Sequence, residues 1–117
     1  MAQDYEQLEV LIVDDCTPDE SISIVEKMIS GYEGSHIYRI IRHAKNGGLS
    51  AARNSGLHEA SGELIYFLDS DDYICERAIS SLVKLYNQTQ ASVVVGNLKI
   101  VDHQTGEVVR NLSLIHI

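Results

Sequence analysis

The chain has 117 residues and a formal net charge of −8, from 17 acidic and 9 basic residues. A surface this acidic repels phosphate backbones, so nucleic acid is disfavoured as a partner. Its 44% hydrophobic content, with a single proline, argues against disorder and predicts one folded domain.

The N-terminal part of the sequence predicts a strand and then a helix. The nearly continuous apolar run Leu8–Val13 is typical of a strand buried on both faces, and it ends at a pair of acids. A helix start follows, with Thr17 as the capping residue, Pro18 in the first helical position and Glu20 completing a capping box.

The middle of the sequence predicts two more strands with a short helix between them. A strand is expected at Ile37–Arg42, followed by a glycine-rich turn at 46–48 and a helix at Leu49–Ala60. Gly62 is placed as the C-terminal cap of that helix, and a third strand is predicted at Leu64–Leu68.

The last part of the sequence predicts a helix from Glu76 to about Asn87, a buried strand at Ala91–Val95 and a hairpin formed by Lys99–Asp102 and Glu107–Arg110. Strands that alternate with helices indicate an α/β fold with a parallel sheet. In such sheets, ligands bind at the carboxyl ends of the strands.

Acidic residues follow two of the predicted strands: Asp14 and Asp15 after the first, and Asp69, Asp71 and Asp72 after the third. Carboxylates this close repel one another unless a cation joins them, and Mg²⁺ or Mn²⁺ prefers such oxygen ligands. The alternative for the second group is a solvated turn that caps the next helix. The first pair could cap its own loop, bind a base or ribose, or help to hold a metal.

The turn at Gly47 and Gly48 opens a helix whose N-terminus favours anions, and Arg53 lies one turn into that helix. Arg53 could pair with a phosphate or with an aspartate, although a bare Gly-Gly turn is equally typical of an ordinary loop. The histidines show no ligand spacing, so each is interpreted as a surface or packed residue: His36, His43, His58, His103 and His116.

The two cysteines, Cys16 and Cys75, fit no metal or redox spacing. No signal peptide opens the chain, and no apolar run approaches the roughly 20 residues that span a bilayer. We therefore expect free thiols and a cytoplasmic location.

Taken together and in this order, the motifs resemble glycosyltransferase family 2. The resemblance runs through LEVLIVDDCTPDES and NGGLSAARNSGLHEASGELIYFLDSDDYI and, more loosely, through ASVVVGNLKIVD. It implies a Rossmann-like GT-A nucleotide-diphospho-sugar transferase fold for residues 1–110. It also implies a metal-dependent, inverting transfer of a sugar from a nucleoside diphosphate, with UDP favoured, to a glycan or lipid-linked acceptor.

The resemblance also implies roles for individual residues. Asp15 would contact the nucleotide base with Asp14 beside it, and Asp69 and Asp71 would form the family's Asp-x-Asp motif. Asp71 and Asp72 would hold Mg²⁺ or Mn²⁺, which neutralises charge on the departing diphosphate. The remaining pocket residues implied are Gly47, Gly48 and Arg53.

The sequence departs from the family at both ends. The family's first strand, which lies centrally in its sheet, and its acceptor-binding half, which carries the general base, find no match here, so no catalytic base is assigned. The final LSLIHI fits neither the family nor a natural ending, and residues 111–117 are interpreted as a possibly non-native tail. We therefore expect this chain alone to be inactive and to bind UDP with Mn²⁺ weakly or not at all. The whole enzyme could still act at the cytoplasmic face of a membrane.

Two alternatives stay open. A response-regulator receiver domain is also an α/β fold and also opens with a strand and an acid pair. However, Asp69 and Lys99 fit its phosphorylation site and conserved lysine poorly, and a receiver leaves NGGLSAARN unexplained. The other alternative is an inactive fragment that binds no ligand.

Overall fold

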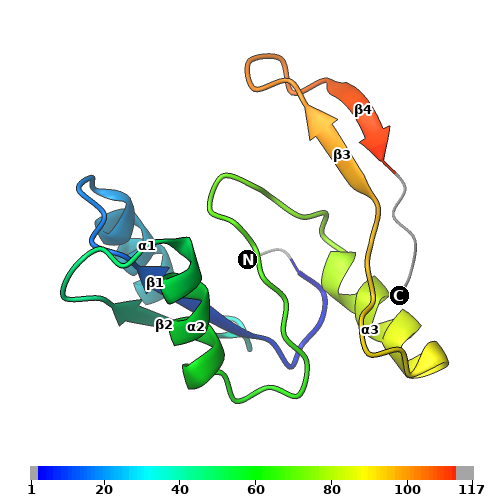
Figure 1. Ribbon diagram of the computed structural model, residues 1–117, viewed down its shortest axis with the longest axis horizontal. Helices are drawn as coiled ribbons and strands as arrows, with labels where there is room; N and C mark the ends of the chain where they lie inside the picture. Colours follow the sequence, from blue (N-terminus) through cyan, green and yellow to red (C-terminus); the bar gives the residue numbers. More distant parts are fainter. Residues whose placement is uncertain (1–2, 113–117) are drawn as a thin grey trace. The chain divides into compact units, whose positions relative to one another are not determined.

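The computed structural model of the chain describes residues 3–112, which form two compact units (Figure 1). The N-terminal unit is Glu6–Tyr73, and the C-terminal unit comprises the described residues of Met1–Tyr5 and Ile74–Ile117. The N-terminal unit contains four elements: β1 (Glu9–Asp14), α1 (Ser21–Ser30), β2 (Ile37–Arg42) and α2 (Leu49–Glu59).

The two strands of the N-terminal unit pair in parallel, as predicted, with α1 as the crossover between them. The pairing continues to the carboxyl end of the sheet, where Asp14 lies opposite Arg42 and the His43 N–H donates to the Asp14 carbonyl oxygen at 2.9 Å. Helix α2 packs on β1, and a Cβ at Gly56 would lie 3.6 Å from Val13 Cγ2. The α/β fold with a parallel sheet is therefore confirmed.

The predicted start of α1 is wrong. The helix begins at Ser21, and the side chain of its N-cap residue, Glu20, makes no capping bond. Two carboxylates bind the backbone earlier: Asp14 Oδ1 accepts from Thr17 N–H, and Asp19 Oδ1 accepts from Ser21 N–H, both at 2.9 Å. These short turns hold residues 14–20 out of helical geometry, because such side-chain bonds compete with helix formation.

The end of α2 also differs from the prediction. The helix stops at Glu59, and Ala60 is already extended, with φ −69° and ψ 136°, so Gly62 does not cap it. Instead, the carboxylate of Glu9 on β1 accepts bonds from the Ser61 N–H and hydroxyl at 3.1 and 2.5 Å. This tertiary contact takes the chain out of the helix before Gly62.

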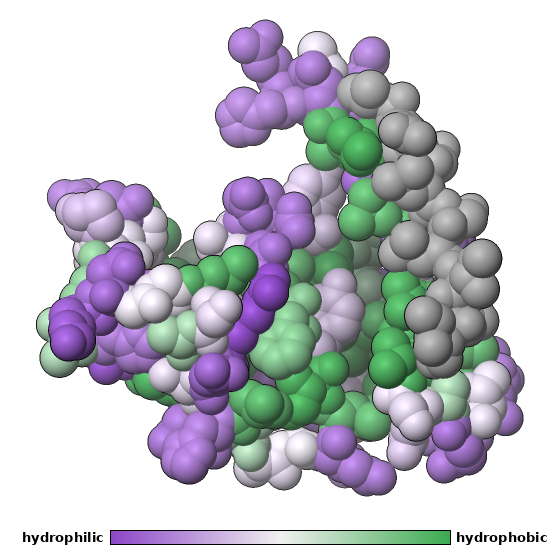
Figure 2. All heavy atoms as spheres, in the orientation of Figure 1, coloured by the Kyte–Doolittle hydropathy of each residue, from purple (hydrophilic) through white to green (hydrophobic). Residues whose placement is uncertain are grey.

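Two predicted strands, Leu64–Leu68 and Ala91–Val95, are not formed. A strand requires a neighbour that completes its ladder of hydrogen bonds. Within residues 3–112, β1 and β2 pair only with each other, and no segment pairs with 64–68 or 91–95. The apolar side chains of 64–68 consequently stay 44–52% exposed, and Figure 2 shows apolar groups open at the surface.

The C-terminal unit confirms the predicted helix and hairpin, as α3 (Ala78–Thr89), β3 (Leu98–Val101) and β4 (Val108–Leu112). Among the residues whose side chains the structure describes, only Ile79 on α3 is buried. Strand β4 includes residues 111–112, whereas the rest of the predicted tail lies outside the described residues. No helix in the described part of the chain is long and apolar enough to cross a bilayer.

Candidate functional site

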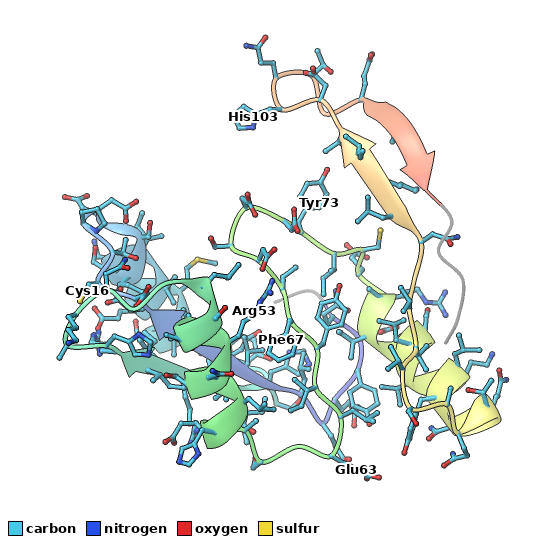
Figure 3. The ribbon with its side chains drawn as sticks, viewed as in Figure 1. Cys16, Arg53, Glu63, Phe67, Tyr73 and His103 are labelled. Carbon is cyan, nitrogen blue, oxygen red and sulfur yellow. The ribbon has the colours of Figure 1, made fainter. Side chains whose placement is uncertain are left out.

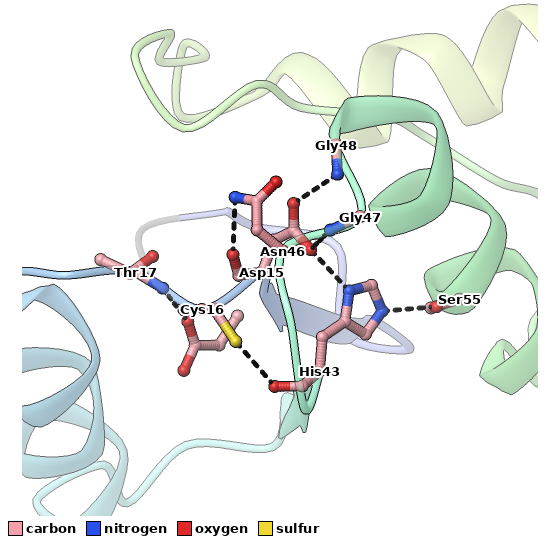
Figure 4. Close-up of polar contacts among 9 residues, drawn as sticks. Asp15, Cys16, Thr17, His43, Asn46, Gly47, Gly48 and Ser55 are labelled. Atoms are coloured by element: carbon pink, nitrogen blue, oxygen red, sulfur yellow. Dashed lines mark hydrogen bonds and ion pairs between the residues drawn. The ribbon is translucent and has the colours of Figure 1, made fainter.

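Asp15, the first residue after β1, caps the loop that leads into α2 (Figure 4). Its Oδ1 accepts from the Gly47 N–H at 2.7 Å, and its Oδ2 accepts from the Gly48 N–H at 2.8 Å. The side-chain amide of Asn46 donates to the Asp15 carbonyl oxygen at 3.0 Å. Gly48, the residue before α2, has no side chain to cap the helix, so the carboxylate of Asp15 binds its amide instead.

His43, the first residue after β2, connects Asp15 to α2. Its Nδ1 lies 2.8 Å from Asp15 Oδ1, and its Nε2 lies 2.7 Å from the hydroxyl of Ser55 on α2 (Figure 4). Because an ionised carboxylate can only accept, Nδ1 carries a proton and donates to Asp15. The imidazole therefore bridges the ends of two strands and one helix, and only 17% of it is exposed.

The two loop glycines are required by geometry. Gly48 has φ 88° and ψ 175°, a region that is essentially restricted to glycine. A Cβ at Gly47 would lie 2.9 Å from the Cβ of Ala51, which is closer than van der Waals contact allows. The loop backbone thus approaches both the Asp15 carboxylate and the first turn of α2 closely.

The hydrogen bond from the Gly47 amide, followed by the one from His43, lowers the pKa of Asp15 below its ordinary value of 3.8. Folding therefore favours the ionised carboxylate. The resulting stabilisation of the folded state is present above pH 3.8 and is lost as the pH falls through the lowered pKa of Asp15.

We therefore predict that the Gly47 and Gly48 amide resonances shift together in an NMR acid titration, with a midpoint below 3.8. The cause is protonation of the carboxylate that both amides bind. Asp15→Asn should abolish this step, whereas Asp102→Asn, which removes a carboxylate in the other unit, should leave it unchanged. A midpoint at or above the ordinary carboxyl value would contradict the bonding described.

The second acidic group, Asp69, Asp71 and Asp72, lies in a turn closed by a bond from the Asp72 N–H to the Asp69 carbonyl oxygen at 3.0 Å. One carboxylate oxygen from each residue lies within 4.8 Å of the others. Within residues 3–112, the carboxylates of Asp71 and Asp72 have no hydrogen-bond or ion-pair partner. This donor set, made only of oxygens and open to solvent, fits Mg²⁺ or Mn²⁺.

Arg53 connects this acidic turn to α2. Its Nη2 lies 2.8 Å from Asp69 Oδ1, and its guanidinium lies 5.9 Å from the ring centre of Phe67, toward which it extends from the helix (Figure 3). Arg53 follows Gly48 by five residues, or about 7.5 Å along a helix axis. The loop before α2 therefore contacts the first acidic group, and Arg53 in the helix contacts the second.

The structure brings most of the predicted site residues to α2 and to the loop before it. Asp15, Gly47 and Gly48 form one network, and Arg53 and Asp69 form an ion pair. Asp14 is different: it binds the Thr17 amide, as a loop cap does.

Sequence reasoning assigned no role to His43 or Ser55. A signal for His43 was present, since Asp15 and His43 lie at the carboxyl ends of two strands that the sequence predicts for one parallel sheet. The register that pairs Asp14 with Arg42 places the next two residues beside each other.

The order Asp15–His43–Ser55 is that of a nucleophilic triad, but its surroundings do not support acyl transfer. Ser55 lies within α2, and the nearby Gly47 and Gly48 amides, which could stabilise an oxyanion, already bind Asp15. The arrangement instead orients Asp15 and the loop.

Comparison with curated proteins finds bacterial glycosyltransferases. The chain is 37% identical to glycosyltransferase GlyA of Streptococcus pneumoniae over 83% of its length, which is 13% of that protein. It is 31% identical to GlyG of the same organism over 91% of its length, covering 34% of that protein. It is 35% identical to the poly(ribitol-phosphate) beta-glucosyltransferase of Bacillus spizizenii over 80% of its length, covering 14% of that protein.

The chain thus spans about a third or less of the length of these relatives. No solved structure matches it, and none of these comparisons supports a receiver domain. The model of the family described as Glycosyl transferase family 2 matches residues 1–115, the region that contains both acidic groups and the α2 loop, and the chain belongs to this family.

Proposed function

We propose that the N-terminal unit forms the binding site for a nucleoside-diphosphate sugar, with Mg²⁺ or Mn²⁺ between the acidic turn and the diphosphate. The observation that carries this proposal is the convergence of three carboxylates within 4.8 Å next to the Arg53–Asp69 ion pair. Membership of a glycosyltransferase family supports a ligand-binding role for this cluster, because a cation held by carboxylates can bind the diphosphate of a sugar donor.

In this proposal, Asp71 and Asp72 hold the cation, because their carboxylates have no other partner in the described residues. Arg53 keeps Asp69 beside them and balances part of the negative charge. The bound cation would neutralise charge on the departing diphosphate. The Gly47–Gly48 loop brings backbone close to the ligand, and Asp15, with Asp14 beside it, binds the nucleoside.

The bonding of Asp15 favours uridine as the nucleoside. A carboxylate has about four acceptor positions, and Gly47, Gly48 and His43 use three of those on Asp15. The remaining position suits a single donor, such as the uracil imide N–H. Guanine presents two adjacent donors, N1–H and N2–H, and would need both carboxylate oxygens free.

For the reaction, we propose an inverting transfer to a hydroxyl of a glycan or lipid-linked acceptor in cell-envelope polysaccharide synthesis. The acceptor oxygen attacks the anomeric carbon as the bond to the diphosphate breaks. Two relatives are named as a poly(ribitol-phosphate) beta-glucosyltransferase and a poly(ribitol-phosphate) beta-N-acetylglucosaminyltransferase, and these names support an acceptor that is a polymer with free hydroxyl groups.

We further propose that turnover needs regions that lie outside the match in the longer relatives, including an acceptor-binding part and its base, and that these 117 residues alone are inactive. For location, we propose the cytoplasm, with action of the whole enzyme at the membrane face. The free, exposed thiols of Cys16 and Cys75 fit a reducing compartment.

The proposal is tested by NMR titration of the ¹⁵N-labelled chain with UDP and with GDP, each with and without Mg²⁺. This method detects the weak binding expected here. UDP with Mg²⁺ should shift resonances of residues 46–48 and 69–72, and GDP should bind about 10-fold more weakly, because guanine leaves one donor unpaired. Equal binding of the two nucleotides would refute the uridine assignment, and shifts confined to other residues would refute the site.

A further inference from the structure

We propose that His43 is a positioning residue of the nucleotide-sugar site: it is anchored at Ser55 and fixes the Asp15 carboxylate against the Gly47–Gly48 loop. This inference rests on the proposed function in one respect: that the site held in shape before binding is a nucleotide-sugar site. The geometry itself depends on the described contacts alone.

The contacts of His43 show why it controls Asp15. Without the imidazole, the Asp15 carboxylate would keep only its two amide bonds, from Gly47 to Oδ1 and from Gly48 to Oδ2, and these alone would oppose its rotation about the bond to Cβ. The Nδ1 contact at 2.8 Å adds a second bond to Oδ1. Oδ1 is then occupied on both sides, and Oδ2 carries the acceptor position left for a ligand.

The anchor at Ser55 fixes the imidazole in turn. The 2.7 Å contact to Nε2 comes from a residue inside α2, the helix whose first residues follow the Gly47–Gly48 loop. Asp15 therefore binds the loop just before the first turn of this helix, and His43 contacts Ser55 in its second turn. A rigid element at both ends of the relay leaves Asp15 little freedom, as preorganisation of a binding site requires.

Two substitutions of His43 separate its two bonds. In His43→Asn, the side-chain amide nitrogen takes the place of Nδ1, so the bond to Asp15 can remain. In His43→Gln, the amide nitrogen takes the place of Nε2, so the contact to Ser55 can remain and the bond to Asp15 is lost. Both replacements are neutral and polar. If His43 only filled space, the two variants would therefore change the spectrum and the affinity in the same way.

The first measurement is the ¹H–¹⁵N spectrum of the 117-residue chain. Amides bound to a carboxylate resonate downfield, so we expect His43→Asn to keep the Gly47 and Gly48 shifts near those of the wild type. His43→Gln should move both toward ordinary values. Ser55→Ala, which keeps a good helix former in α2, also keeps the bond to Asp15, so the glycine shifts should resemble those of His43→Asn. This variant should also alter the imidazole ¹⁵N shifts that report the Nδ1–H tautomer.

The second measurement is UDP affinity with Mg²⁺, expected to fall about 10-fold in His43→Gln and to remain close to the wild type in His43→Asn. Identical behaviour of the two variants, or unchanged glycine shifts in both, would overturn the positioning role. If the wild type binds no UDP while the glycine shifts follow the expected order, the proposed function fails and the positioning of Asp15 by His43 stands.

Discussion

Replacing Gly48 with alanine will destabilise the N-terminal unit by about 1–3 kcal/mol, the cost of placing an L-residue in a region restricted to glycine. At φ 88° and ψ 175°, a Cβ clashes with its own backbone even though open space surrounds it. Relief of the strain will move the residue 48 amide, from which Asp15 Oδ2 accepts a hydrogen bond. We therefore expect the loss of stability to be accompanied by weaker nucleotide binding, measured by urea denaturation and by UDP titration.

Gly56→Ala is the matched control. Gly56 is inside α2, and its new methyl group would meet Val13 Cγ2 at 3.6 Å, an ordinary contact. Alanine in a helix is favoured over glycine by about 0.5–1 kcal/mol, so this variant should be slightly more stable than the wild type. A Gly48→Ala protein as stable as Gly56→Ala would show that the loop does not need its observed geometry.

Asp71→Asn will weaken Mn²⁺ binding by about 10-fold or more, because even the groups that orient metal ligands cost this much when they are removed. The substitution keeps the size of the side chain and removes one of three charges that lie within 4.8 Å of one another. Calorimetric titration of the chain with Mn²⁺ measures the effect. In a longer protein that carries this sequence, the same change should abolish metal-dependent turnover.

Glu63→Gln provides the control for charge. Glu63 is exposed in the same unit and outside the acidic turn, so its replacement removes the same charge without removing a proposed ligand. Its Mn²⁺ affinity should match that of the wild type. Equal losses in both variants would mean that Mn²⁺ senses only the net charge of −8.

Much of the N-terminal unit follows from local patterns. A nearly continuous apolar run predicts β1, because strands of a parallel sheet are covered on both faces. The Gly47–Gly48 turn and the helix after it are equally local. These features place Asp15 and the loop at one end of the sheet, which is why their proximity could be predicted before their contacts were known.

The predictions that failed depended on which partner each group binds, and a local sequence pattern does not specify that partner. Leu64–Leu68 has the composition of a strand, but a ladder requires a neighbour, and none of the described residues supplies one. Thr17 is a residue type that often caps helices, yet here its amide is bound by the Asp14 carboxylate and the helix begins later. The spacing of His43 matches no ligand motif and so predicts only a surface or packed residue, whereas its place beside Asp15 follows from the register of two strands.

The acidic turn and the α2 loop must serve the same ligand if the proposed site is correct. Paramagnetic broadening by Mn²⁺ tests this in the ¹⁵N-labelled chain. We predict that Mn²⁺ alone broadens residues 69–72, and that adding UDP deepens this broadening and extends it to Gly47 and Gly48. Broadening that stays at the acidic turn, with the loop unaffected at saturating UDP, would contradict a shared site.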